Sequence, residues 1–368
     1  MRKHPTSQIL MAAVVAVWLI LSLVVWSWPD QDHSLHERRL LARHPALSLD
    51  ALSSGQWMES VETYISDQLP GRFAFRTLKA ITRFHLLRQK ENQGIAMVNG
   101  HAVKLEHTID PSSIDHAIQR FQSLYDRYLV ANDHVITFAF IPDKLAFAAA
   151  DLAYPAPDNA GLLRYLERQL PFASVVDLSE TLSLDDYYRT DPHWRQEQLL
   201  PAAQQLSEAL GIADPLSNDW QATTLDRPFY GAYYGQSALP LQPDRLVYLT
   251  SPATEAATVR HAATGDVTPV YDLEKAAGKD PYDLFLSGAS PLLTITSPQA
   301  DTERDLIVFR DSFAGSLIPL LLEGYRTITL VDIRHIASDQ LAEHITFRDQ
   351  DILFCYSSTI LNAAGTLR

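Results

Sequence analysis

Three side chains from two distant parts of the sequence have the composition of an activated-serine site. Asp191 and His193 stand two residues apart, and Ser312 follows much later, after an apolar run. Residues i and i+2 of an extended segment project to the same face, so Asp191 can accept a hydrogen bond from one imidazole nitrogen while the other nitrogen faces a hydroxyl. These residues predict a serine hydrolase or acyltransferase site.

Each of these residues also has an interpretation without chemistry. Ser312 stands where an apolar strand at 306–309 gives way to a helical run at 313–322, and a serine at such a junction commonly caps the helix. The same place, at the carboxyl end of a strand, is where open α/β sheets bind ligands and where helix N–H groups can stabilise an oxyanion. Asp191 and His193 can equally be a turn aspartate beside a packed histidine. The residue types alone leave both interpretations open.

No metal or cofactor site is predicted. Among the 13 histidines, His101, His107, His116 and His134 show no paired helical spacing of the kind that binds zinc. The single cysteine, Cys355, lies in an apolar stretch and is expected to be a small buried hydrophobe. One cysteine allows no internal disulfide, which for an exported chain suits a bacterial envelope protein.

Composition limits the class of protein. The chain has 368 residues, of which 46% are hydrophobic and 20% charged, enough to bury one large core or two ordinary ones. Its formal net charge of −14 would repel phosphate backbones, so nucleic acid is excluded as an expected partner.

Residues 9–28 form an uncharged apolar run of about the 20 residues that a helix needs to cross a bilayer. Arg2 and Lys3 precede the run, and Asp30 and Asp32 follow it, which predicts a cytoplasmic N-terminus and an exported remainder. The alternative is a cleaved signal peptide, but its apolar region is usually shorter and ends at a small-x-small site, unlike the bulky residues here. Residues 1–28 are therefore expected to be a cytoplasmic tip and an uncleaved, single-pass anchor in the cell membrane.

Residues 29–93 are expected to be a juxtamembrane helical region. Residues 34–43 are polar and basic, which predicts a helical linker. Apolar residues then recur at helical spacing over 57–65 and again over 73–87, which predicts two amphipathic helices.

Residues 94–368 are expected to form one α/β domain. Asn99-Gly100 between the apolar runs 95–98 and 103–105 predicts a hairpin. Strands are then predicted at 135–141, 174–178, 306–309, 327–331 and 352–354. A helical stretch at 114–129 precedes the first of them, and further helical stretches lie between strands at 162–170 and 313–322. Short buried runs that alternate with helices indicate a parallel sheet. The segment 220–291 breaks this alternation and is interpreted as an insertion that shapes a substrate cleft.

Three spaced blocks give the chain a resemblance to a known family. Residues 188–194 (Tyr-Arg-Thr-Asp-Pro-His-Trp) are similar to the motif that names the DHHW family, residues 310–317 to its Asp-Ser-Phe block, and residues 332–334 to its Asp-x-Arg segment. Weaker similarities lie at 141–144, 229–231 and 282–288. Over nearly all of its expected exported part, the chain resembles this family, which is related to the SGNH-like domains of the alginate O-acetylation proteins.

The resemblance implies an SGNH-hydrolase-like, flavodoxin-like parallel sheet flanked by helices, in which Asp and His precede Ser along the chain. It also implies that Ser312 is the nucleophile, that His193 is the general base and later the acid, and that Asp191 fixes the imidazole tautomer. The backbone N–H groups of Ser312 and Gly288 are the expected oxyanion-hole donors.

The chain departs from the family pattern in two places. Pro192 stands where relatives carry a second histidine, which leaves the Asp-x-His pair intact and fixes the backbone between its members. Residues 287–290 read Ser-Gly-Ala-Ser where many relatives read Gly-Gly-Asn, so the expected oxyanion asparagine is missing. Losing one oxyanion donor typically costs about 10²–10³ in turnover, so such a site can still work slowly.

Two functions from different classes follow. The first is an extracytoplasmic, membrane-anchored serine O-acyltransferase or esterase acting on a cell-surface polysaccharide; the resemblance implies acetyl as the acyl group and a membrane-bound O-acyltransferase as a possible donor partner. The second is a catalytically degenerate glycan-binding or polysaccharide-assembly protein in which Tyr230, Tyr233 and Tyr234 contact sugar rings; these tyrosines can equally pack a loop. Arg310 and Arg334 are candidates for holding an anionic substrate, or are salt-bridged residues at strand ends.

Overall fold

A computed structural model describes residues 5–34, 36–131, 134–212, 214–215 and 219–368. Its contacts divide the chain into two compact units, each described by itself below. The first comprises residues 1–93 and 234–241, and the second comprises residues 94–233 and 242–368.

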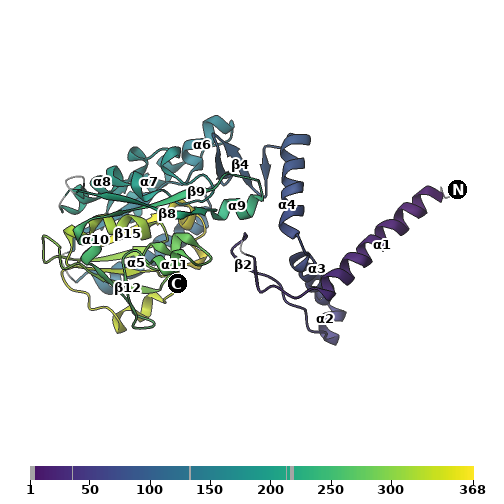
Figure 1. Cartoon of the computed structure of the whole chain (residues 1–368). Coiled ribbons are helices and arrows are strands. Elements are labelled where there is room, and N and C mark those ends of the chain that lie inside the picture. The colour runs from purple at the N-terminus through teal and green to yellow at the C-terminus, as the bar shows by residue number, and fades with distance from the viewer. Residues whose placement is uncertain (1–4, 35, 132–133, 213, 216–218) are drawn as a thin grey trace. The chain divides into compact units, whose positions relative to one another are not determined.

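The first unit begins with a long apolar helix, α1 (Pro5–Ser27), drawn in purple in Figure 1. Between Gln8 and Ser27 only Ser22 and Val25 are buried, and large apolar side chains such as Trp18 and Leu23 are more than half exposed. This is the one helix in the described part of the chain that is long and apolar enough to cross a membrane. Arg2 and Lys3, on which the predicted orientation depends, lie outside the described residues.

The remainder of the first unit is only partly as predicted. Residues 34 and 36–43 do not form a helix. Instead β1 (His33–Ser34) pairs antiparallel with β2 (Arg39–Leu40), and Arg39 forms two hydrogen bonds of 2.6 and 2.8 Å with the buried Asp67. The two amphipathic helices are present as α3 (Gln56–Gln68) and α4 (Arg72–Ile81), the latter continuing as a wider π-helical turn to Leu86. The short elements α2 (Leu49–Ser53) and β3 (Glu91–Asn92) complete the unit's regular structure.

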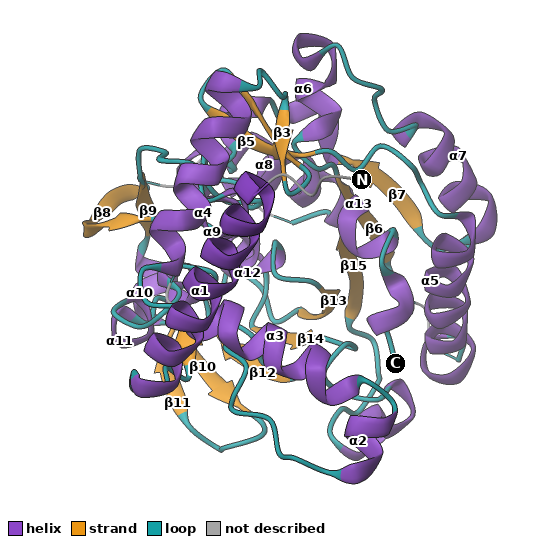
Figure 2. Cartoon of the chain, turned by 90° about the vertical axis from the view of Figure 1, so that its right-hand side faces the viewer, coloured by secondary structure: helices purple, strands orange, loops and turns teal. Residues whose placement is uncertain are grey.

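The second unit is built on a mostly parallel sheet, which confirms the predicted α/β class. Within the described residues the strand order is β11 (Val267–Pro269), β10 (Thr258–His261), β12 (Leu292–Thr296), β14 (Thr327–Val331), β13 (Asp305–Arg310), β15 (Asp351–Ser357), β6 (Ile136–Ile141) and β7 (Ser174–Asp177). The five strands from β14 to β7 run parallel, as predicted. Figure 2 shows the strands following one another in this order.

Alternating side chains of each buried strand serve two different cores. On β6, Phe138 and Phe140 belong to the core with α5 (Pro111–Leu124) and α7 (Asn159–Gln169). Ala139 and Ile141 face the other core, with α8 (Leu200–Leu210) and the α12 (Ala314–Leu317) segment. Both faces of the sheet are therefore covered by helices, which explains why its strands are continuously apolar.

The segment 220–291 does more than interrupt the alternation. It begins with an antiparallel pair, β8 (Gln221–Phe229) and β9 (Asp244–Thr250). It then adds β10 and β11 to the central sheet, where β10 pairs antiparallel with β12 and β12 pairs antiparallel with β14. This antiparallel extension was not predicted, because short strands with mixed exposure carry little sequence signal.

Smaller elements complete the second unit. The predicted hairpin is present as β4 (Ile95–Val98) and β5 (His101–Lys104), and both turn residues, Asn99 and Gly100, have positive φ. The other α-helices of this unit are α6 (Leu145–Leu152), α10 (Pro252–Ala256), α11 (Leu273–Ala276) and α13 (Ser358–Leu361). The helix α9 (Ala232–Ser237) begins in the second unit and ends in the first, which includes residues 234–241. Cys355 is a free, buried thiol on β15.

Candidate active site

A tight loop carries Asp191 and His193. Its two sides are held together by an antiparallel bridge between Tyr187 and Trp194 and by a 3.0 Å hydrogen bond from the Tyr188 N–H to the His193 carbonyl. A second segment backs the loop, where the N–H of Gly231 donates to Thr190 Oγ1 at 2.8 Å. A Cβ on Gly231 would lie 2.3 Å from the Cβ of Asp191, so only glycine allows this close approach.

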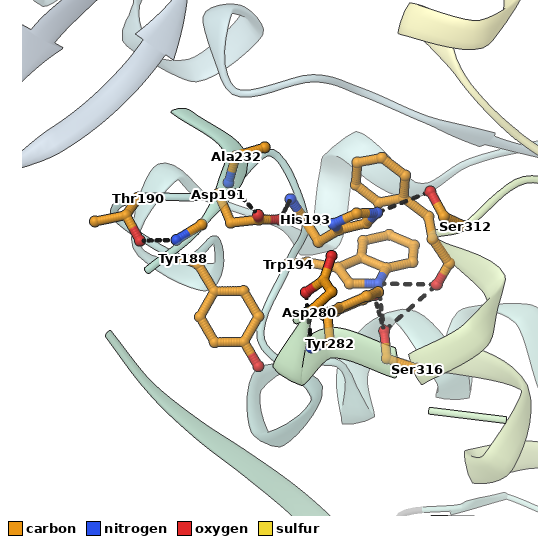
Figure 3. A network of polar contacts seen from close by, with 12 residues as sticks. Tyr188, Thr190, Asp191, His193, Trp194, Ala232, Asp280, Tyr282, Ser312 and Ser316 are labelled. Carbon is orange, nitrogen blue, oxygen red and sulfur yellow. Dashed lines mark hydrogen bonds and ion pairs between the residues drawn. The ribbon is translucent and has the colours of Figure 1, made fainter. Parts of the chain in front are cut away.

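The structure brings Asp191, His193 and Ser312 into one hydrogen-bonded line, shown in Figure 3. Asp191 Oδ1 lies 2.6 Å from His193 Nδ1, and His193 Nε2 lies 2.8 Å from Ser312 Oγ. Asp191 is almost fully buried, and its Oδ2 accepts the Ala232 N–H at 2.8 Å. A carboxylate only accepts, so His193 carries its proton on Nδ1 and offers Nε2 as an acceptor to the serine hydroxyl.

Ser312 follows β13 in a turn that its neighbour Asp311 fixes. The buried Asp311 accepts the Phe313 N–H at 2.9 Å with one oxygen and the Ser357 N–H at 2.7 Å with the other. The helix after the turn starts at Ala314, and no side chain caps it. Ser312 Oγ contacts His193 Nε2 instead, so the structure favours the activated-serine interpretation over helix capping. The hydrogen-bonded chain of Asp191, His193 and Ser312 is called the relay below.

Trp194 and Tyr282 form the wall behind the relay. Ser316 stands one turn after Ser312, and its Oγ accepts the Trp194 indole N–H at 2.9 Å. The same Oγ lies 2.9 Å from the Tyr282 hydroxyl. The Tyr282 ring stacks on the His193 ring at a centroid distance of 4.0 Å. This network joins the histidine loop to the serine helix. The sequence showed Trp194 as part of a motif. Its role could not be predicted, because its hydrogen-bond partner Ser316 lies 122 residues away.

Lys144, which the sequence analysis gave no role, lies beneath the same loop. It is 2% exposed, and its ammonium donates to the carbonyls of Ala102 at 2.6 Å, Tyr188 at 2.8 Å and Asp191 at 3.3 Å. Its Nζ also lies 5.4 Å from the centre of the Tyr233 ring. Lys144 therefore ties the loop that carries Asp191 to the hairpin β4–β5. The sequence signals for Lys144 were its place shortly after the apolar strand β6 and within the weaker family similarity at 141–144.

We expect Lys144 to make stability depend on pH. Burial lowers the pKa of Lys144 to about 7, although Asp191, Asp244 and Asp143 favour its charged form. An unfolded lysine keeps its proton to about pH 10.4, so between these values the unfolded chain binds more protons and the free energy of unfolding rises with pH. The destabilisation caused by Lys144→Met should therefore grow by about 1 kcal/mol per pH unit between pH 7.5 and 9.5. Urea unfolding at several pH values measures it.

The matched control is Lys104→Met, which removes a lysine that is 41% exposed and paired with Glu106. Its effect should not change with pH in this range. If the effect of Lys144→Met were equally flat, Lys144 would keep its proton in the folded protein.

The two N–H groups that the resemblance implies as oxyanion donors differ in whether they are already hydrogen-bonded. The Gly288 N–H is hydrogen-bonded to the Phe285 carbonyl at 3.1 Å inside a turn, so it is not free to bind an oxyanion, and that expectation is corrected. The turn that contains this N–H has positive φ at Leu286, Ser287 and Gly288. Among the described residues, nothing accepts a hydrogen bond from the Ser312 N–H.

The two arginines are placed differently from each other. Arg334 forms a two-pronged ion pair with the buried Asp332, with contacts of 2.8 and 2.6 Å, as a salt-bridged strand-end residue would. Arg310 is 3% exposed, its Nε and Nη2 have no hydrogen-bond partner among the described residues, and burial lowers its pKa. Neither guanidinium lies open to solvent as a ready anion site.

The tyrosines proposed to contact sugar do not share one environment. Tyr230 is 40% exposed. Tyr233 is buried against Lys144. In the first unit, Tyr234 packs on Phe73, at a centroid distance of 5.4 Å, and on His36. The positions of Tyr233 and Tyr234 are explained by packing. Of the three tyrosines, only Tyr230 exposes a substantial part of its side chain to solvent.

The chain is similar to known proteins in structure but not in sequence at the level of families or curated proteins. No protein-family model and no curated protein matches the sequence. A DHHW family protein from Eubacterium siraeum has a similar structure, with a TM-score of 0.58 and 19% identity over 75% of this chain and 95% of that chain. The chain has the fold of that DHHW protein.

One further solved structure has a similar fold, and another is less similar. Bacillus cereus PatB1 with a sulfonyl adduct gives a TM-score of 0.58 and 19% identity over 73% of this chain and 95% of that one. The O-acetyltransferase domain of Pseudomonas putida AlgJ gives a TM-score of 0.46 and 14% identity over 73% of this chain and 92% of that one. The DHHW and PatB1 structures confirm the SGNH-like fold that the sequence motifs predicted.

Proposed function

We propose that this protein is a serine O-acyltransferase or esterase that is anchored in the cell membrane and acts on a cell-surface polysaccharide outside the cytoplasm. The observation that carries the proposal is the continuous relay from Asp191 through His193 to Ser312, with contacts of 2.6 and 2.8 Å. Such a relay activates a hydroxyl that is otherwise a weak nucleophile.

In the proposed reaction, Ser312 Oγ attacks the carbonyl carbon of an acyl ester while its proton passes to His193 Nε2. The Ser312 N–H donates to the resulting oxyanion. The tetrahedral intermediate collapses, the leaving alcohol takes the proton from His193, and an acyl-serine remains. A glycan hydroxyl or water then gives its proton to His193 and attacks the acyl-serine, so that the acyl group leaves as a new ester or as a free acid and Ser312 regains its proton.

The remaining parts of the proposal rest on the sequence. The resemblance described above supports acetyl as the acyl group, a polysaccharide as the acceptor and a membrane-bound O-acyltransferase as the donor partner. The exposed apolar surface of α1 supports a membrane segment, because side chains such as Trp18 and Leu23 would otherwise face water. We propose that this segment stays uncleaved as an anchor, since bulky residues stand where a signal peptide would have a small-x-small site. We propose the cytoplasmic side for the N-terminus.

A sulfonyl fluoride tests the proposal directly, because it captures an activated serine as a stable sulfonate ester. The PatB1 structure with a sulfonyl adduct suggests this reagent for the present fold. Treatment of the full-length protein with phenylmethylsulfonyl fluoride should add one sulfonyl group, and peptide mass spectrometry should place it on Ser312. An excess of p-nitrophenyl acetate should slow the labelling.

Two variants make the test specific. Ser312→Ala should remove the label, and His193→Ala should slow labelling strongly because the hydroxyl then has no base. Ser174→Ala, at an exposed serine at the start of β7, should label as the wild type does. Equal labelling of wild type and Ser312→Ala would contradict the proposal, as would the absence of any labelling.

A further inference from the structure

A polar cavity lies in the same unit as the relay. Its volume is about 630 Å³, which is within the range of small-molecule sites. None of Asp191, His193 and Ser312 lines it. The charged side chains of its lining are Asp185, Arg189, Arg195, Glu197, Asp244 and Arg245, and His101 and Tyr187 line it as well.

One of the carboxylates in this lining is already used by the protein. Asp244 accepts the N–H groups of Arg189 and Thr190, each at 2.8 Å, and the Thr190 hydroxyl at 2.6 Å. It thereby holds the loop that leads to Asp191. The cavity and the relay therefore share one short segment, residues 185–197, whose two ends line the cavity and whose middle carries Asp191 and His193.

The other groups form donor–acceptor pairs with atoms left unused. Arg195 Nη1 lies 3.7 Å from Glu197 Oε1, while Arg195 Nε and Glu197 Oε2 are buried without a hydrogen-bond partner among the described residues. His101 is 3% exposed, with Nε2 at 3.4 Å from Asp185 and Nδ1 likewise unpartnered. Polar atoms are costly to bury without partners, so this part of the lining is less well paired than the surroundings of Asp244.

The charge of the lining decides the class of ligand. Three guanidinium groups, on Arg189, Arg195 and Arg245, are balanced by the carboxylates of Asp185, Glu197 and Asp244. Burial, and secondarily Lys144, lowers the pKa of His101 to about 4, so its ring is neutral at pH 7, with one donor and one acceptor nitrogen. An anion would pair with the arginines but meet Asp185 and Glu197. A hydroxyl group both donates and accepts, so it can serve both members of such a pair.

We infer that this cavity is a binding site for an uncharged sugar residue of an oligosaccharide, held by the Arg195–Glu197 and His101–Asp185 pairs. Pro243 and Val247 add apolar surface for the C–H faces of the ring. A polysaccharide held here can present another of its residues to Ser312. That use rests on the proposed function, whereas binding in the cavity does not.

Binding is tested with the full-length protein in lauryldimethylamine oxide, a detergent without a sugar headgroup. The probes are cellotetraose, mannotetraose, maltotetraose and tetra-N-acetylchitotetraose, with tetragalacturonate as an acidic counterpart, measured by saturation-transfer NMR and calorimetry. At least one neutral tetrasaccharide should bind with a Kd of about 1 mM or tighter and more tightly than tetragalacturonate.

Variants locate the binding. Val247→Trp fills the cavity and Arg245→Ala removes an exposed arginine from its rim, and each should weaken binding at least about tenfold. Arg260→Ala, at an exposed arginine of β10 outside the cavity lining, and Ser312→Ala should bind as the wild type does. Arg260→Ala should also hydrolyse p-nitrophenyl acetate as the wild type does, and thermal unfolding should show that Val247→Trp and Arg245→Ala are folded.

Three results would overturn the inference. They are no binding of any neutral probe, tighter binding of tetragalacturonate than of all neutral probes, and binding that survives Val247→Trp and Arg245→Ala but is lost in Ser312→Ala. If the wild type binds a neutral tetrasaccharide but does not hydrolyse p-nitrophenyl acetate, the result would count against the proposed reaction alone.

Discussion

Replacing Ser312 by alanine is expected to lower the turnover of an acetyl ester by a factor on the order of 10⁶, and replacing His193 by alanine should have a similar effect. The two side chains share one hydrogen bond of 2.8 Å, and each is inactive without the other. The Ser312→Ala/His193→Ala double variant should therefore be hardly slower than either single variant. Steady-state hydrolysis of p-nitrophenyl acetate by the full-length protein, corrected for the spontaneous rate, measures all three.

The controls are Ser174→Ala and His344→Ala, at an exposed serine and an exposed histidine in the same unit. They should keep wild-type turnover, and thermal unfolding should show that Ser312→Ala folds as the wild type does, since Ser312 is only half-buried. A double variant whose loss equals the product of the two single losses would mean that the residues act independently, which would remove the basis of the proposed mechanism.

Asp191→Asn is expected to lower turnover by about 10⁴ while leaving a folded protein. The carboxylate accepts the backbone N–H of His193 at 3.1 Å, the Nδ1–H of the same residue at 2.6 Å and the Ala232 N–H at 2.8 Å. An asparagine has only one acceptor oxygen. If that oxygen pairs with Ala232, its NH₂ group faces the imidazole and favours the tautomer with the proton on Nε2, which cannot accept the proton of Ser312.

The tautomer can be observed separately from the rate. In ¹⁵N NMR spectra of the variant, the His193 signals should change from the Nδ1–H to the Nε2–H tautomer, and kcat should fall far more than the affinity for the ester. Asp226→Asn, at an exposed carboxylate on β8, is the control and should change neither. Near-normal turnover in Asp191→Asn, with the tautomer changed, would show that the carboxylate does not act through His193.

Much of the fold could be predicted because its signals are local. The strands β6, β13, β14 and β15 are short apolar runs between helical segments, and a buried parallel sheet needs just that pattern. Asn99 and Gly100 tolerate positive φ, which fixed the hairpin between β4 and β5. The antiparallel strands β10 and β11 escaped prediction, since their pairing depends on neighbours rather than on their own alternation.

The sequence by itself determined which side chains are available for chemistry, namely Asp191 and His193 two residues apart and Ser312 at the end of a strand. Only the tertiary structure decided that the serine turns to the histidine instead of capping a helix, that the Gly288 N–H is used inside a turn, and that Lys144 supports the loop. The physical reason is range. Backbone propensity and periodicity act over a few residues, whereas the hydrogen bond between His193 and Ser312 joins residues 119 positions apart, and its geometry depends on how the whole sheet packs.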